Sequence, residues 1–338
     1  MQSSKYAKER KKLTLLLSSF GGLLILLFVI SMCAGRYPIA LHHVLGFFLG
    51  NEIPEMSARV ILNLRIPRTL LAALIGAALS VSGAIYQSAF HNKLVSPDLL
   101  GVSSGASVGA CLAILLGLSG AIVSTFSFLL GFTTVLITVL IARAFGNRSN
   151  VILLLSGIAV GGLMSSFIGL LKYLADDEMK LAEMTYWLLG DISGATMGDV
   201  LVMLPITIIS SVVAILFAWR LNVLTLGEKE ARALGVNYKA TMAVLIAVAT
   251  LLTAGAVSVS GTIGWVGLVI PNIVRLFVGS DNRKVIPVSL LGGAAYMMIV
   301  DMLARSLAPN EIPLSVITGI IGTPLFLLSI FKRRKELL

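Results

Sequence analysis

The chain has 338 residues, of which 57% are hydrophobic and only 12% are charged, and its mean hydropathy is +0.97. Soluble domains carry about 25% charged residues, so a soluble fold of this size would lack the polar side chains needed to cover its surface. The composition therefore indicates an integral membrane protein. The net charge of +10 fits the bias of Lys and Arg towards the inner side of a membrane, and we expect no nucleic-acid partner.

A membrane-spanning helix needs roughly 20 apolar residues, and the unbroken apolar runs of this chain predict an all-α polytopic fold of about ten such helices. The first run is too long for a signal peptide and is interpreted as a retained span. We expect one transmembrane domain over residues 1–338, with spans at 13–35, 69–90, 103–119, 121–145, 151–175, 198–219, 240–260, 263–280, 285–305 and 313–331.

The basic residues predict the orientation of these spans. If both termini lie inside, 19 of the 26 Lys and Arg residues fall in inner segments and seven fall in outer ones. Because inner loops of membrane proteins are enriched in Lys and Arg, the chain is expected to be N-in and C-in.

The longest polar interruption on the inner side is segment 220–239. It predicts a short helix from Glu228 to Leu234 that ends at Gly235, with Leu226, Ala231 and Leu234 exposed beside the membrane. Such a helix could dock on a cytoplasmic partner, or the segment could simply be a solvated connection. The sequence has no G-x-x-x-x-G-K-[ST] motif for nucleotide phosphates, so ATP-driven transport would need an ATPase on another chain.

On the outer side, Arg65, Arg68 and Arg305 run against the positive-inside bias. The guanidinium fork suits carboxylates of a partner, although for any single arginine ordinary anchoring at the membrane interface is the simpler explanation.

The pattern G-x-S-x-G occurs at Gly101–Gly105, with His91 as the nearest potential base. A hydrolase would need a strand–turn–helix context there, whereas small residues at a helix start explain the pattern by packing. Charges inside the spans are sparse and lie near span ends, as for Asp301. This scarcity argues against an ion-coupled carrier and favours a pathway lined by small and polar groups.

Five stretches occur in an order that resembles one family. They are RIPRTLLAALIGAALSVSGAIYQ, SPDLLGVSSGASVGA, LNVLTLGEKEARALGVN, SGTIGWVGLVIPNIVRLFVG, and DMLAR followed by EIPLSVITGIIGTPLF. Together they resemble the permeases of ABC importers for iron chelates, haem and cobalamin, the type II importers, from about Arg65 to Phe331.

The resemblance implies a transport subunit rather than an enzyme, in the inner membrane of a bacterium or archaeon. It implies a permease homodimer, two cytoplasmic ATPase subunits that bind ATP and Mg, and an external binding protein. No cofactor, metal or catalytic residue is expected on this chain. The cargo expected is a metal chelate, a ferric siderophore first and haem or cobalamin next. The alternatives are an ion-coupled secondary carrier and an importer of this family that moves an oxyanion such as molybdate.

The resemblance also assigns roles to residues. Binding-protein docking falls on Arg65, Arg68 and Arg305, and the translocation pathway on Ser156, Gly157, Ser165, Ser166 and Gly169. The inner gate falls on Asn147, Ser149 and Asn150, and ATPase coupling on Leu226, Gly227, Glu228, Ala231, Leu234 and Gly235. The chain departs from the family at Asn92–Pro97, which affects local loop geometry, and at Asn272, where many members have a titratable histidine.

Overall fold

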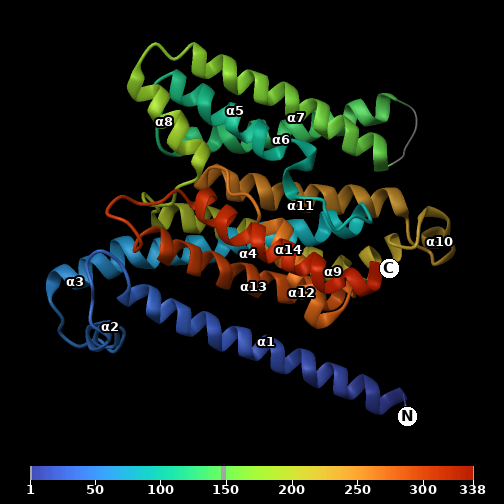
Figure 1. Cartoon of the computed structure of the whole chain (residues 1–338), viewed down its shortest axis with the longest axis horizontal. Coiled ribbons are helices and arrows are strands. Elements are labelled where there is room, and N and C mark those ends of the chain that lie inside the picture. Colours follow the sequence, from blue (N-terminus) through green and yellow to red (C-terminus); the bar gives the residue numbers. More distant parts are fainter. Residues whose placement is uncertain (1, 146–149, 338) are drawn as a thin grey trace.

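The structure is a computed structural model that describes residues 2–145 and 150–337, and every regular element in this part of the chain is helical (Figure 1). In chain order the elements are α1 (Gln2–Cys33), α2 (Leu41–Phe48), α3 (Glu55–Val60), the π-helical turn η1 (Ile61–Arg65), α4 (Ile66–Ala89), the 3-10 turn η2 (Pro97–Leu100), α5 (Val102–Leu115), α6 (Ala121–Ala144), α7 (Asn150–Tyr173), α8 (Glu178–Leu189), α9 (Met197–Leu224), α10 (Glu228–Ala233), α11 (Tyr238–Ser260), α12 (Val266–Val278), α13 (Asn282–Ala304) and α14 (Leu314–Leu337).

Within the described residues, eight helices are long and apolar enough to cross a membrane. They are α1, the continuous helix from α3 to α4, α6, α7, α9, α11, α13 and α14. Two further apolar helices, α5 and α12, have 14 and 13 residues. The eight long and two short helices confirm the all-α polytopic fold with about ten transmembrane helices.

The two short helices are each about 20 Å long, which is less than the roughly 30 Å thickness of a bilayer core. Neither helix is long enough to cross such a core by itself. Before α5, the turn η2 lies inside the bundle, where Thr138 of α6 donates a hydrogen bond of 3.1 Å to the carbonyl of Leu100. Irregular backbone is tolerated at membrane depth only where protein or a water-filled cavity surrounds it, and here α4, α6 and α7 surround it.

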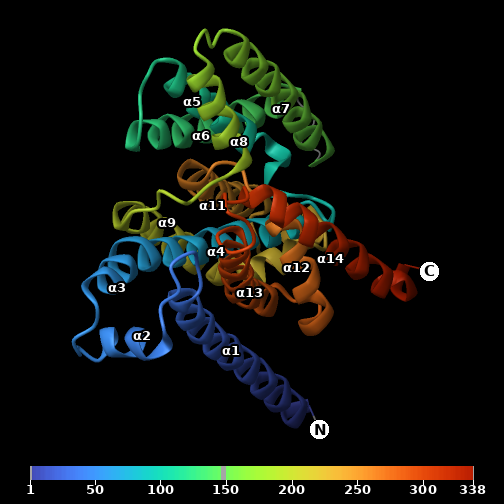
Figure 2. The same cartoon turned by 60° about the vertical axis from the view of Figure 1, so that its left-hand side comes forward.

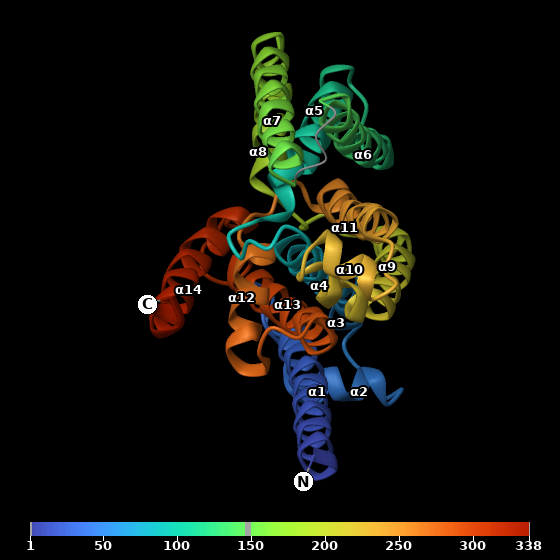
Figure 3. The ribbon, with the colours of Figure 1, turned by 90° about the vertical axis from the view of Figure 1, so that its right-hand side faces the viewer.

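Helix α4 is the central element of the bundle, with α9, α11, α12 and α13 packed around it (Figures 1 and 3). Its small residues allow very close backbone contacts. A Cβ atom added at Gly83 would lie 1.8 Å from the carbonyl oxygen of Gly267 in α12, and one added at Gly76 would lie 2.1 Å from that of Gly293 in α13. Small residues at helix crossings are the usual means of close association in lipid.

Buried polar side chains fix the same helix at its inner end. The guanidinium of Arg275 in α12 donates hydrogen bonds to Gln87 and Ser88 of α4, the second at 3.0 Å. The hydroxyl of Ser88 in turn donates to Asn282 at the start of α13, at 2.7 Å. Arg275 is buried, and this network joins α4, α12 and α13.

The remaining helices lie on two sides of this centre. Helices α5 to α8 form a separate layer on one side, and α1 runs along the opposite side (Figures 1 and 2). Both termini and α10 lie at one end of the bundle, whereas α2 and α8 lie at the other (Figure 1). This arrangement is the one expected for an N-in and C-in chain.

The contact of α4 with α12 generates a stability prediction. Replacing Gly83 by Ala forces the two backbones apart and is expected to destabilise the fold by about 1–3 kcal/mol, despite the higher helix propensity of Ala. Thermal unfolding of the purified chain in detergent measures this effect. Gly162→Ala is the matched control, because a Cβ there meets no atom within 4 Å; equal melting temperatures for the two variants would contradict the packing.

Candidate functional site

The inner segment between α9 and α11 folds as a compact turn–helix–turn. Gly227 and Gly235 flank α10 with φ angles of +109° and +73°, which L side chains rarely adopt. The carboxylate of Glu228 pairs with Arg232 at 2.6 Å along one face of the helix. The carbonyl side chain of Asn237 then caps α11 by accepting from the amide of Ala240 at 3.1 Å. The predicted short helix is present, and glycine geometry fixes both of its ends.

The apolar side chains of this segment divide into two groups. Leu226 and Leu234 are 58% and 53% exposed, so each presents an apolar surface at the inner end of the bundle. The expectation that Ala231 is also exposed is wrong, because it is fully buried with Val223 and Val236. Ala231 instead attaches α10 to the ends of α9 and α11.

The outer arginines are buried within the chain. The second membrane helix begins at Glu55 rather than near residue 69, so Arg65 and Arg68 lie more than two turns inside a helix instead of before one. Arg65 is 4% exposed and donates hydrogen bonds to the backbone carbonyls of Met32 and Tyr37. Arg65 therefore provides hydrogen-bond donors to carbonyl groups at the end of α1 and in the loop that follows α1.

Arg68 and Arg305 share one buried carboxylate. The Nε of Arg68 lies 2.6 Å from Oδ1 of Asp301, and its two terminal nitrogens contact both oxygens of Glu311 at 2.8 and 3.0 Å. The Nε of Arg305 lies 3.4 Å from Oδ2 of Asp301, and its Nη2 donates to the carbonyl of Ser31 at 2.8 Å. All three arginines therefore bind groups within the chain, and these contacts join α1, α4 and α13. Their role in docking stays a prediction.

The five predicted pathway residues all lie on α7, on two different faces. Ser156 and Gly157 are buried, and Gly157 packs on the backbone of Leu99 in η2. Ser165, Ser166 and Gly169 are exposed. The hydroxyls of Ser165 and Ser166 donate to backbone carbonyls one turn earlier, at 3.0 and 3.1 Å, so they present a mildly polar surface.

The predicted inner gate lies mostly outside the described residues. Asn147 and Ser149 belong to residues 146–149, and Asn150 is described only as the first residue of α7.

Asp98 is a residue that the sequence reasoning missed. It lies in η2, within the bundle and beside α7, yet its side chain is exposed and accepts a hydrogen bond from Ser103. An ionisable group at membrane depth normally faces a protein interior or water rather than lipid. The sequence signal for an irregular segment with a polar side chain here was the combination of proline, aspartate and glycine in a stretch too short to form a full helix.

The hydrogen bond from Ser103 to Asp98 also bears on whether the G-x-S-x-G pattern is catalytic. Ser103 pairs with Asp98, whereas Nε2 of His91 lies 3.0 Å from the carbonyl of Leu224, far along the chain. The three residues therefore do not form a nucleophile with its base.

Comparison with known proteins identifies the family of this chain. The FecCD transport family matches residues 23–332. The chain belongs to this family. It is 37% identical to the molybdate import system permease protein of Haemophilus influenzae, over 99% of this chain and 98% of that protein. It is 38% identical to the hemin transport system permease protein of Yersinia pestis, over 81% and 84% of the two chains.

A solved structure agrees with this assignment. An inward-facing metal-chelate type ABC transporter superposes with a TM-score of 0.84 at 37% identity, covering 94% of this chain and 98% of that one. The chain is therefore an ABC importer permease, a multi-pass transport subunit of the inner cell membrane. The family resemblance seen in the sequence is confirmed.

The buried network around Asp301 generates a second prediction. Asp301→Asn leaves Arg68 and Arg305 without their shared counter-charge, and breaking a buried ion pair from one side costs about 3–5 kcal/mol. The melting temperature in detergent should fall strongly. Glu55→Gln is the control, since its pair with Arg59 is 70–79% exposed and surface pairs contribute at most about 1 kcal/mol. An unchanged melting temperature for Asp301→Asn would show that these arginines do not hold the fold together.

Proposed function

We propose that this chain is the membrane-spanning permease of an ATP-driven importer that moves a metal chelate inward. The observation that carries the proposal is the helix α10 at the inner end of the bundle. Its neighbours Leu226 and Leu234 are the apolar side chains that a soluble partner can bind, and α10 itself is fixed to two long helices through Ala231.

Such a connection can transmit force. A helix that docks in a cleft of an ATPase moves with that cleft, and α9 and α11 carry the motion into the membrane because they both pack on α4. We propose that two ATPase subunits supply ATP and Mg, and that Leu226, Gly227, Glu228, Ala231, Leu234 and Gly235 form the coupling segment.

We also propose that two copies of the permease meet across α7. This helix is long, apolar and only 17% buried along its most hydrophobic window. Leu163 and Leu170 are about half exposed, in the same part of the helix as Ser165, Ser166 and Gly169. A second copy would turn this mixed surface into a wall of a pathway, whose inner end would be gated near Asn147, Ser149 and Asn150, with Ser156 and Gly157 supporting the helix from behind.

An external binding protein is the remaining partner of the proposal. If its acidic residues reach Arg65, Arg68 or Arg305, they compete with Asp301, Glu311 and backbone carbonyls that these guanidinium groups already bind. Docking and the opening of the outer side would then be linked through one charge network.

For the cargo, we propose a metal chelate, with a ferric siderophore first and haem or cobalamin next. The hemin permease of Yersinia pestis and the solved metal-chelate type transporter support this class. Molybdate is the second candidate, because the molybdate permease of Haemophilus influenzae matches over nearly the full length of both chains.

The coupling segment can be tested by one exposed side chain. Leu234→Asp places a charge on the proposed ATPase contact and should abolish the transport-linked stimulation of ATP hydrolysis in the assembled transporter. Leu307→Asp changes another exposed leucine, 64% accessible against 53% for Leu234, at the outer end of the bundle and should leave stimulation intact. If both variants are stimulated like the wild type, segment 220–239 is only a connection.

The cargo can be tested with the whole transporter reconstituted in vesicles together with its binding protein. Uptake of a radiolabelled ferric siderophore, of haemin, of cobalamin and of molybdate is measured in parallel. The proposal predicts ATP-dependent accumulation of one of the three chelates and none of molybdate. Accumulation of molybdate alone would overturn the cargo assignment while leaving the permease assignment in place.

A further inference from the structure

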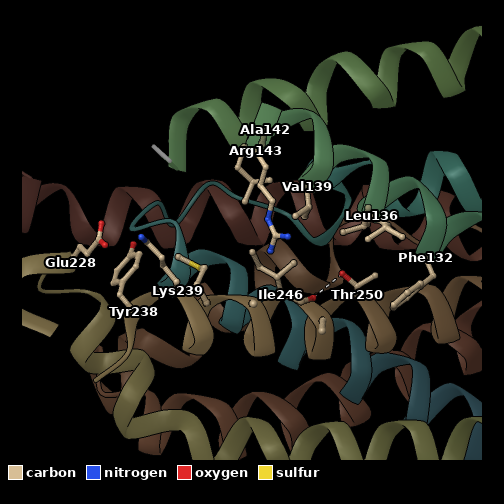
Figure 4. A pocket seen from close by; sticks show the side chains of 15 residues that line it. Phe132, Leu136, Val139, Ala142, Arg143, Glu228, Tyr238, Lys239, Ile246 and Thr250 are labelled. Carbon is tan, nitrogen blue, oxygen red and sulfur yellow. Dashed lines mark hydrogen bonds between the residues drawn. The ribbon is translucent and has the colours of Figure 1, made fainter. Parts of the chain in front are cut away.

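A groove of about 560 Å³ runs between α6 and α11 in the inner half of the bundle (Figure 4). Its floor consists of apolar side chains that are almost fully buried, such as Val135, Met242 and Ile246. Phe132 and Leu136 of α6 form one wall and are 38% and 51% exposed. The groove is therefore apolar along its floor and this wall, and it is open at the surface of the bundle.

The deep end of this groove offers no free polar group. The one hydroxyl there, on Thr250, donates to the carbonyl of Ile246 at 2.7 Å and also lies 3.1 Å from the hydroxyl of Tyr86. Both of its hydrogen-bonding directions are used within the protein. An occupant of the deep end is consequently held by apolar contact alone.

The mouth of the groove is cationic. Figure 4 shows the guanidinium of Arg143 pointing into the space between α6 and α11 and the ammonium of Lys239 at its inner end. Both residues are exposed, and neither has a hydrogen bond or ion pair within residues 2–145 and 150–337. The nearby carboxylate of Glu228 is already paired with Arg232 at 2.6 Å, so it does not neutralise the two cations.

The length of the groove matches one leaflet of a membrane. Arg143 and Phe132 are eleven residues apart on α6, as are Lys239 and Thr250 on α11, and eleven helical residues span about 16 Å. Half of a bilayer core is about 15 Å. The cationic mouth lies at the inner ends of both helices, which places it at the level of lipid headgroups.

The helices that form the groove lie together on one side of the central helix. In Figure 3, α6, α9 and α11 lie on one side of α4, whereas α14 lies on the opposite side.

We propose that this groove is a specific site for an anionic phospholipid of the inner leaflet. The phosphate would bind the guanidinium of Arg143, whose fork matches phosphate geometry, with Lys239 as the second cation. One acyl chain would lie along Val135, Met242 and Ile246. Basic pockets between transmembrane helices on the cytoplasmic side are suited to anionic headgroups, and the apolar floor adds the hydrophobic contact that a soluble phosphate lacks.

The bound lipid would connect two parts of the bundle. Arg143 belongs to the layer formed by α5 to α8, whereas Lys239 is the second residue of α11 and the last residue of the inner segment 220–239. A lipid held by both residues would tie these parts together at the inner surface. This inference concerns the bilayer around the chain and does not depend on the cargo or on the proposed coupling.

The test is native mass spectrometry of the delipidated full-length chain, titrated with dioleoylphosphatidylglycerol or dioleoylphosphatidylcholine. We expect one phosphatidylglycerol to bind each chain more tightly than phosphatidylcholine does. The double variant Arg143→Gln/Lys239→Gln should weaken this binding by about tenfold or more. The control Arg220→Gln/Lys332→Gln removes two other exposed inner cations, which contact Phe217 and Phe277, and should bind like the wild type.

A second pair of variants tests the apolar part. Ala247→Trp fills the groove and should also abolish tight binding, whereas Val244→Trp, on the same helix outside the lining residues, should not. Added phosphatidylglycerol should raise the melting temperature of the wild type and of both controls only. Equal binding of the two lipids, equal loss in both double variants, or unchanged binding in Ala247→Trp would overturn the proposal.

Discussion

The rest of the structure depends on the close approach of α4 to its neighbours. In lipid, apolar side chains give helices no reason to associate, so packing must come from contact between backbones. Gly76 meets Gly293 and Gly83 meets Gly267 at distances that exclude a Cβ atom. These contacts bring α12 and α13 against one central helix, and the other core helices pack around that trio.

Charge networks at both ends of α4 complete this arrangement. Arg68 pairs with Asp301 at the outer end, and Arg275 binds Gln87 and Ser88 at the inner end. Each network joins α4 to a different neighbour, so sliding of α4 along the bundle would break a buried charged contact. These buried contacts therefore fix the position of α4 against α12 and α13.

Much of this architecture could be predicted from the sequence. Long apolar runs indicate transmembrane helices by length alone, and Gly235 predicted the end of α10, because the physical signal is local in both cases. The burial of Arg65 and Arg68 could not be predicted, since their partners Met32, Asp301 and Glu311 are far away in the sequence. The same holds for Ala231, whose burial depends on where α9 and α11 end.

The short helices α5 and α12 show a further limit. Hydropathy counts apolar residues and does not report whether they are helical, so spans of ordinary length were predicted at 103–119 and 263–280. The structure instead has helices of 14 and 13 residues, and the 3-10 turn η2 precedes the first of them. Asp98 lies in this turn, and its position beside α7 became evident only from the packing of η2.

We propose that a separate ATPase, and not an ion gradient, supplies the energy for this permease. Cargo uptake into vesicles that contain the complete transporter tests it most directly, with internal ion composition and ATP varied independently. We expect uptake that requires ATP and the ATPase subunit and persists when proton and sodium gradients are collapsed. Uptake by the permease alone, driven by an ion gradient without ATP, would contradict the account.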